Sequence, residues 1–247
     1  MQCWTATNIG LIRDENQDRV EAKEYNGSIL AVVCDGMGGE RNGSQASDIA
    51  MRELYDRFNA GYQPGLDAES LRVLLTSSVS AANSVIYTTA RMDYKSFGMG
   101  TTCVAAYVEP GWISIVNVGD SRAYLIQGGE MRQITTDHTV VNMLLSQGKI
   151  KREEVAYHPQ RNMLTRAVGV ERVVRPDYYH IPVTEDFLLL LCSDGLSGYC
   201  TEREIFEVIR KHPVEKLHEE LIDLALGKGG RDNISLAVVT NQAMDQR

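Results

Sequence analysis

The sequence predicts an α+β sandwich, and three observations support this fold class. Long β-type segments fill both halves of the 247 residues. One pair of helical segments lies in the first half, and a second pair lies near the end. The connections between the middle β segments are short, which favours antiparallel hairpins. A doubly wound parallel sheet would alternate strand and helix more regularly and is therefore the second choice.

The first half begins with two predicted strands, residues 3–9 and 28–34. Two helices follow, one over 44–58 and a longer one within 66–91. In both helical segments the apolar residues recur at spacings of three and four, which is typical of a helix with one buried face.

The second half mixes strands with shorter helices. Residues 139–147 are a predicted short helix ending at Gly148, and residues 149–163 are polar without a clear period. Thr201 and Glu204 form a capping box, which places a helix start there. The predicted elements are strands at 101–108, 112–118, 121–127, 130–134, 173–181, 186–192 and 234–240, and helices at about 202–211 and 214–226.

Composition narrows the class of protein. The chain is 43% hydrophobic and 23% charged, as in soluble globular proteins, and one large domain or two small ones would fit its length. No repeat, low-complexity tract or Pro/Gly/Ser linker divides it. The formal net charge of −8 gives no global electrostatic support for a nucleic-acid partner.

Cysteines and apolar runs indicate the compartment. The five cysteines are odd in number and include no CxxC pair, which favours buried free thiols in a reducing environment. No apolar stretch approaches the roughly 20 residues of a membrane helix. The N-terminus has neither a basic region nor an apolar core typical of a signal peptide. The sequence therefore predicts a cytoplasmic protein without a membrane partner.

Four aspartates lie in turn-like settings, and three of them adjoin apolar runs: Asp35, Asp194 and Asp232. The fourth is Asp18. A carboxylate beside an apolar core is costly unless it is paired or binds a cation. Their recurrence from opposite ends of the chain indicates carboxylates that converge on one hard-cation site. Oxygen-only ligands suit Mg²⁺ or Mn²⁺, so metal-assisted phosphate chemistry is the leading hypothesis.

The most distinctive local motif is Asp35-Gly36-Met37-Gly38-Gly39. Its glycines allow unusual backbone angles and a close approach to a ligand. Asp35 could bridge two cations, and the carbonyl of Gly36 could be a further ligand. The alternative is a glycine-rich turn capped by Asp35. The spacing does not match the glycine pattern of nucleotide-binding loops.

Two further segments carry candidate site residues. Arg13 precedes Asp18 by five residues, and its guanidinium fork fits a phosphate group, while Asp18 could hold a metal-bound water. An exposed charged loop is the alternative there. Asp120 lies between two predicted strands, where it is either a turn residue or a carboxylate for an additional cation.

His138 and His158 are candidate proton donors, although a single histidine is more often structural or exposed. The sequence has no GxSxG nucleophile motif, no HExxH motif and no paired Cys/His zinc spacing.

In combination, these motifs resemble the metal-dependent serine/threonine protein phosphatases of type 2C, especially the compact bacterial kind. Each motif is weak alone, but the ordered set is specific and covers nearly the whole chain. The matching positions are Arg13, 16–18, 35–39, 100–102, 118–122, 137–138, 164–169, 192–195 and 232–233.

The resemblance implies a fold, a reaction and roles for matching residues. The fold would be a single catalytic domain over 1–247, a four-layer α-β-β-α sandwich of two antiparallel sheets between helices, with a flap near 145–168. The reaction would be hydrolysis of phosphoserine or phosphothreonine monoesters by a water or hydroxide between two Mn²⁺ or Mg²⁺ ions, without a phosphoenzyme. By resemblance, Asp35 and the Gly36 carbonyl, Asp194 and Asp232 hold the two ions, Asp18 orients a coordinated water, Arg13 binds the phosphate, and Asp120 with Asp194 holds a third, weaker ion.

Met37 departs from the family pattern, because many eukaryotic relatives have a histidine, proposed as the general acid, at this position. Methionine cannot donate a proton, so another group must protonate the leaving alkoxide. The expected partners are phosphoproteins, with an opposing Ser/Thr kinase, and the expected state is a monomer. The alternatives are a binding module that has lost its metals, a metal-dependent hydrolase of small phosphate esters or nucleotides, and, as a subclass, a regulatory phosphatase with one dedicated partner protein.

Overall fold

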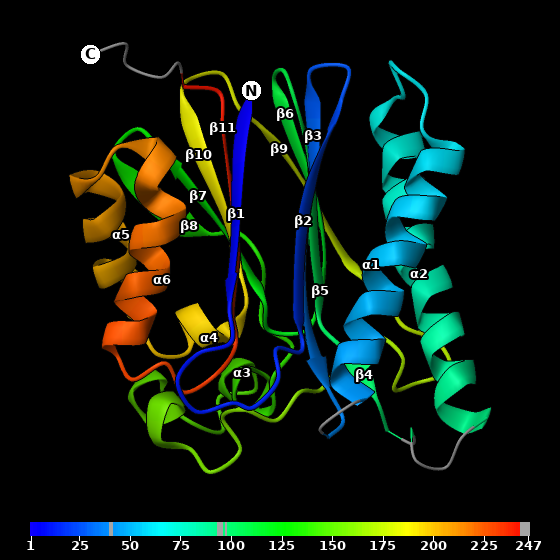
Figure 1. Cartoon of the computed structure of the whole chain (residues 1–247), viewed down its shortest axis with the longest axis vertical. Helices are drawn as coiled ribbons and strands as arrows, with labels where there is room; N and C mark the ends of the chain where they lie inside the picture. The colour runs from blue at the N-terminus through cyan, green and yellow to red at the C-terminus, as the bar shows by residue number, and fades with distance from the viewer. Residues whose placement is uncertain (40–41, 93–95, 97, 243–247) are drawn as a thin grey trace.

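The computed structural model describes residues 1–39, 42–92, 96 and 98–242. Two antiparallel sheets lie face to face, and helices cover the outer face of each (Figure 1). The predicted α+β sandwich, with its four layers, is confirmed. Every strand pairing given by the register is antiparallel, so the parallel alternative is wrong.

The first sheet joins the two ends of the chain. Gln2 lies opposite Thr240, so the first and last strands pair directly. In spatial order the strands are β1 (Gln2–Asn8), β11 (Ile234–Thr240), β10 (Phe187–Cys192), β7 (Arg122–Gln127) and β8 (Glu130–Gln133).

The second sheet is formed mainly by the first half of the chain. Its order is β2 (Asp18–Tyr25), β3 (Ser28–Met37), β5 (Cys103–Glu109), β6 (Trp112–Val118) and β9 (Asp177–Pro182), and the short β4 (Gly100–Thr101) pairs with the end of β3.

Each sheet has its own pair of covering helices (Figure 1). α1 (Asn42–Gly61) and α2 (Ala68–Met92) pack on the second sheet. α5 (Glu202–Lys211) and α6 (Leu217–Gly227) pack on the first. The short elements are α3 (Val140–Ser146), η2 (Arg152–Tyr157), α4 (Asp194–Ser197) and η3 (Val214–Lys216).

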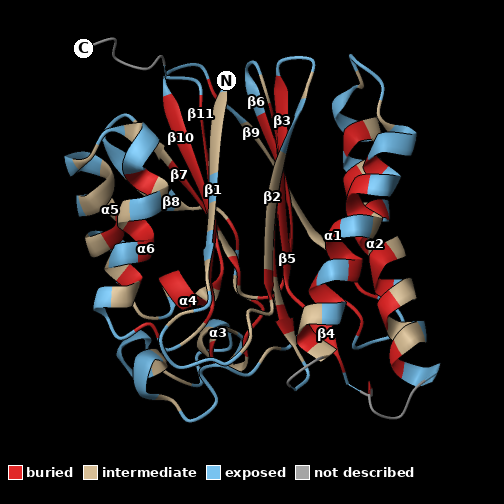
Figure 2. Cartoon of the chain, in the orientation of Figure 1, coloured by how far each residue is buried: buried red, intermediate tan, exposed pale blue. Residues whose placement is uncertain are grey.

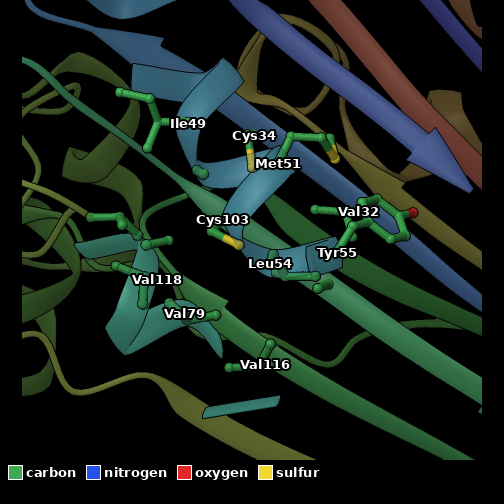
Figure 3. Packing of buried hydrophobic residues seen from close by; sticks show 14 of the residues in the cluster. Val32, Cys34, Ile49, Met51, Leu54, Tyr55, Val79, Cys103, Val116 and Val118 are labelled. Carbon is green, nitrogen blue, oxygen red and sulfur yellow. The ribbon is translucent and has the colours of Figure 1, made fainter. Parts of the chain in front are cut away.

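The hydrophobic core lies in three layers, one between the sheets and one beneath each helix pair (Figure 2). Strand β3 shows why: Ile29 and Val33 face the other sheet, whereas Val32 packs beneath α1. Figure 3 shows the layer beneath α1, which includes Cys34 and Cys103. Residues buried on both faces of a sheet form continuous apolar runs, as residues 28–34 do. All five cysteines are free thiols.

One predicted strand needs correction, and some observed elements were not predicted. Strand β2 was not predicted, because only Val20 and Ala22 are apolar on its inward face, too few for a recognisable alternation. The strand predicted at 173–181 begins only at Asp177, because the preceding backbone is engaged elsewhere: Arg175 O accepts a hydrogen bond from Arg166 Nη1 at 2.8 Å. Within the segment 149–163, η2 forms one stretch of 3₁₀-helix.

The sheets bring the motif-bearing ends of β2, β3, β10 and β11 to one end of the sandwich, the end that carries α3, α4 and β4 in Figure 1. There β3 ends beside the start of β2, and β10 ends beside the start of β11. None of the helices in the described ranges has both the length and the apolar character needed to cross a membrane.

Candidate active site

Asp18, which is buried, and Asp35, which is half-buried, form the centre of the site. Asp18 begins β2 and lies directly opposite Asp35 in the antiparallel register. Only 1% of Asp18 is exposed, and its Oδ2 accepts a hydrogen bond of 2.7 Å from Ser193 Oγ. Its Oδ1 is buried and has no hydrogen-bond partner in the described part of the protein. A buried oxygen of this kind is costly unless a ligand binds it.

The backbone of Asp35 is held by two threonines of the β4–β5 junction. Its N–H donates to Thr102 Oγ1 at 2.9 Å. Its carbonyl accepts from the Thr102 N–H at 2.8 Å and from Thr101 Oγ1 at 2.9 Å. The backbone N–H and carbonyl of Asp35 therefore both have hydrogen-bond partners at this junction. The next residue, Gly36, must lack a side chain, because a Cβ there would lie 2.1 Å from the Gly43 carbonyl oxygen in α1.

Asp194 and Asp232 are brought together by a close approach of two backbones. Asp194 opens α4 two residues after the end of β10, and Asp232 lies two residues before the start of β11. Between them, a Cβ at Gly195 would lie only 1.9 Å from the Asn233 carbonyl oxygen. The sequence setting of Gly195 suggests a simple turn residue. The structure shows instead that packing requires glycine at this position.

Asn233 attaches the N-terminal loop to this pair. Its Oδ1 accepts from the Gln17 N–H at 2.8 Å, and its Nδ2 donates to the carbonyls of Ile9 and Glu15 at 2.9 and 3.0 Å. The loop that carries Arg13 is thereby anchored at both ends.

Arg13 lies at the rim of the carboxylates. Its Nη2 donates to Asp232 Oδ2 at 2.7 Å, and 55% of its side chain is exposed. This hydrogen bond raises the pKa of Arg13, so the guanidinium stays charged. The exposed part of the guanidinium fork is accessible to an anionic ligand from solvent.

The electrostatics of the site favour a cation. Burial, followed by the charges of Asp18, Asp194, Asp120 and Asp232, raises the pKa of Asp35 well above its usual range. Burial likewise raises the pKa of Asp18 to about 7, reinforced by Asp194 and Asp232 and opposed by the Ser193 hydroxyl. Burial and Asp232 raise the pKa of Asp194 to about 6. Like-charged carboxylates repel one another, and a bound cation removes that repulsion.

The donor set fits a hydrated hard cation. Within residues 1–39, 42–92, 96 and 98–242, no three His, Cys, Asp or Glu side chains are placed so that they could hold a metal ion by themselves. The carboxylates are nevertheless close enough to raise one another's pKa, and they offer only oxygen. Mg²⁺ and Mn²⁺ accept oxygen ligands, and Mg²⁺ keeps several waters and uses few carboxylates, so these residues fit such ions.

Asp120 lies at the edge of the same site. It follows Gly119, whose φ of +108° and close approach to Thr102 admit only glycine. Burial, then the charges of Asp194 and Asp137, raise the pKa of Asp120 to about 7. The neighbouring Asp137 is engaged by Arg122, whose Nη2 lies 2.6 Å from Asp137 Oδ2.

A cleft of 620 Å³ leads from the carboxylates to the flap segment, residues 145–168. Asp120 and Asp194 line it, together with Leu145, Val155 and Arg161 of the flap segment. The two candidate histidines lie apart: His138 is buried, whereas His158 is half-buried at the end of η2, with its Nδ1 accepting from the Gln160 N–H.

Sequence reasoning assigned no individual role to three residues that organise the site: Thr102, Ser193 and Asn233. Ser193 and Asn233 each adjoin a motif aspartate in the chain, and Thr102 ends the motif at 100–102. Their short polar side chains at strand ends were the available signal, because such groups commonly bond to nearby backbone.

The comparisons with known proteins agree along the whole chain. The sequence model of the family "Protein phosphatase 2C" matches residues 13–233. The serine/threonine phosphatase stp of Listeria innocua is 38% identical over 244 residues, which cover 97% of this chain and 96% of that protein.

Solved structures agree as well. Serine/threonine phosphatase Stp1 from Staphylococcus aureus is 35% identical, with a TM-score of 0.91 over 98% of this chain and 95% of that one. The catalytic domain of serine threonine protein phosphatase PstP, in complex with two manganese ions, is 34% identical, with a TM-score of 0.83 over 96% of both chains. The motif order, the sandwich and these likenesses together establish that the chain belongs to the protein phosphatase 2C family.

Proposed function

We propose that this protein is a metal-dependent protein serine/threonine phosphatase, which hydrolyses phosphoserine and phosphothreonine monoesters. The observation that carries the proposal is the group of carboxylates around the buried Asp18 at one end of the sandwich. One Asp18 oxygen has no hydrogen-bond partner among the described residues, and the exposed guanidinium of Arg13 lies beside the group. Membership of the protein phosphatase 2C family and the names of its relatives support the same reaction.

Each site residue has a proposed role. Asp35, the Gly36 carbonyl, Asp194 and Asp232 would hold two divalent cations. When bound, such cations neutralise phosphoryl charge and lower the pKa of water.

The remaining roles concern the substrate and the attacking water. Arg13 would bind the phosphoryl oxygens through the exposed part of its fork. Asp18 would accept a hydrogen bond from the attacking water through Oδ1, while the Ser193 hydroxyl fixes its other oxygen.

The substrate would lie in the 620 Å³ cleft, with its phosphorylated residue at the Asp194 end. We propose phosphoproteins as substrates and a Ser/Thr kinase as the opposing enzyme. We further propose that residues 1–247 form one catalytic domain that acts as a monomer in the cytoplasm. The direct pairing of β1 with β11 supports the single domain, and the five free cysteines support a reducing compartment.

Removing metal should abolish the activity. The purified protein should release phosphate from a phosphothreonine peptide with Mn²⁺ or Mg²⁺, lose this activity in EDTA and regain it on readdition, because its site offers only oxygen ligands. A panel of phosphoserine, phosphothreonine and phosphotyrosine peptides and nucleotides measures the substrate class. Faster turnover of nucleotides than of phosphopeptides would instead favour a hydrolase of small phosphate esters, and full activity after exhaustive chelation would exclude the mechanism.

Asp120→Ala separates a metal-ligand role from a turn role. We propose that Asp120 and Asp194 hold a third, largely hydrated cation, whose water could protonate the leaving alkoxide in place of Met37. The variant should then have a lower kcat and need a higher Mn²⁺ concentration for activity, while its free energy of unfolding should be almost unchanged. An aryl phosphate with an acidic leaving group should lose less activity than a phosphothreonine peptide, because it needs less protonation.

A turn role for Asp120 predicts a different result. Substituting a turn residue would lower the free energy of unfolding by about 0.5–2 kcal/mol and leave kcat normal. Equal losses on both substrates would exclude the leaving-group role. Denaturant unfolding and Mn²⁺ titrations of activity measure the two effects separately.

A further inference from the structure

His138 is a buried residue that meets the Gly119–Asp120 turn with both its backbone and its ring. Only 6% of it is exposed. Its N–H donates to the Gly119 carbonyl at 2.9 Å, and the Gly119 N–H donates back to His138 Nδ1 at 3.0 Å. The residue before Asp120 is therefore held by a reciprocal pair of hydrogen bonds.

These bonds decide which ring nitrogen carries the proton. A backbone N–H can only donate, so Nδ1 must accept, and the neutral ring then carries its proton on Nε2. Nε2 lies 3.1 Å from Asp177 Oδ2, to which it donates. Arg166 Nη1 also lies 3.0 Å from Nε2, but these two atoms are both donors and do not bond to each other. Arg166 Nη1 instead donates to Asp177 Oδ1 at 2.6 Å. The Asp177 carboxylate thus accepts from both groups.

The same residue contacts the base of the flap segment. The His138 carbonyl accepts from the Thr165 N–H at 2.8 Å. Arg166, the next residue, shares Asp177 with the His138 ring. Three separate parts of the chain therefore meet at His138: the Gly119–Asp120 turn, the flap base and the start of β9.

We propose that His138 is a positioning residue that holds the Gly119–Asp120 turn against the flap base and so sets the Asp120 carboxylate relative to Asp194. The proposal rests on the proposed function, because Asp120 acts there as a carboxylate of the site. It also removes His138 as a proton donor to substrate, since Nδ1 faces Gly119, Nε2 faces Asp177, and the ring is buried.

Two substitutions distinguish the hydrogen bond at Nδ1 from the hydrogen bond at Nε2. The amide oxygen of asparagine reaches about the position of Nδ1, so His138→Asn keeps an acceptor for the Gly119 N–H and loses Asp177. The longer glutamine amide reaches about the position of Nε2, so His138→Gln keeps Asp177 and loses Gly119. A positioning role predicts that asparagine preserves function better than glutamine.

The first measurement uses metal-free protein and needs no activity. Amide hydrogen exchange of residues 118–121 should accelerate about tenfold or more in His138→Gln and remain within about threefold of wild type in His138→Asn. The second measurement is phosphopeptide hydrolysis against Mn²⁺ concentration. In this assay His138→Gln should raise the half-saturating Mn²⁺ concentration severalfold and lower kcat. His138→Asn should stay close to wild type in both quantities.

His180→Gln in β9 is the matched control. His180 is half-buried and bonds to Ser114 through Nδ1 at 2.9 Å, away from the carboxylates. It should change neither the exchange of residues 118–121 nor the Mn²⁺ requirement. Equal losses in His138→Asn and His138→Gln, or wild-type behaviour of His138→Gln, would overturn the positioning role.

Asp177→Ala tests the same connection from its other end, and it remains available if a His138 variant does not fold. Asp177 is more exposed, with 36% of its side chain accessible. Without this carboxylate, Arg166 should donate to Nε2 and drive the ring proton to Nδ1, which would then oppose the Gly119 N–H. Nitrogen NMR should show the change of tautomer together with faster exchange at Gly119. An unchanged tautomer with unchanged exchange would contradict the proposal.

If phosphatase activity is absent in wild type, the exchange and NMR results still decide this inference independently.

Discussion

Asp35→Asn and Asp194→Asn should each lower kcat by on the order of a hundredfold or more, because charge supplied by bound cations is the main stabiliser of the transition state. Both residues lie among the mutually repelling carboxylates at the centre of the site. The measurement is phosphate release from a phosphothreonine peptide at saturating Mn²⁺. Asp186→Asn, an exposed position just before β10, is the matched control and should remain fully active.

The same substitutions should stabilise the metal-free protein at alkaline pH. A carboxyl group whose pKa is higher in the folded than in the unfolded state destabilises the fold once it ionises, and protonation removes that cost as the pH falls. The pKa of Asp18 is raised to about 7 and that of Asp194 to about 6. Metal-free wild type should therefore gain stability between about pH 8 and pH 5, and each Asn variant should gain less.

Denaturant unfolding of metal-free protein at pH 8 and pH 5 measures this difference. Wild-type turnover in Asp35→Asn at saturating Mn²⁺ would remove that residue from the metal site. A metal-free wild-type protein whose stability does not change over this pH range would show that the carboxylates do not repel one another as the geometry indicates.

Arg13→Ala should lower kcat/KM by roughly ten- to a thousandfold, the effect of losing about 1.5–4 kcal/mol of charged contact with the phosphoryl group. Stability should change little, because the ion pair with Asp232 is largely exposed on the Arg13 side. Steady-state kinetics with a phosphothreonine peptide, together with denaturant unfolding, measures both effects.

Arg13→Lys should restore only part of the activity, because an ammonium group lacks the planar fork that binds phosphate at two points. Arg57→Ala removes an exposed arginine of α1 that pairs with Glu53, and it should keep wild-type kinetics. Unchanged kinetics in Arg13→Ala would make Arg13 a surface charge without a role in phosphate binding.

Local pattern was sufficient for most elements of the fold. The apolar run at 28–34 and the helical periodicity in 66–91 each correspond to an observed element, because burial of one face or both leaves a direct mark on composition. The edge strand β2 left only a weak mark, since Val20 and Ala22 are the only apolar residues on its inward face. Its existence depends on pairing with β3, which is a property of the assembled sheet.

The chemistry of the site was also visible in the sequence. Asp35 and Asp194 adjoin apolar runs, and a carboxylate at such a position needs a partner or a cation wherever the chain folds. The order of the motifs along the chain is by itself sufficient to indicate the family.

Tertiary structure alone decided how these residues meet. Gly195 looks like a turn residue in the sequence, yet its role is to let α4 approach the Asn233 backbone. The Ser193 hydroxyl bonds to Asp18, 175 positions earlier in the chain, and the His138 ring joins Gly119 to Asp177. Sequence determined which groups this protein has and how costly it is to bury them. The contacts that satisfy or orient those groups are long-range, and no local pattern encodes a hydrogen bond between distant strands.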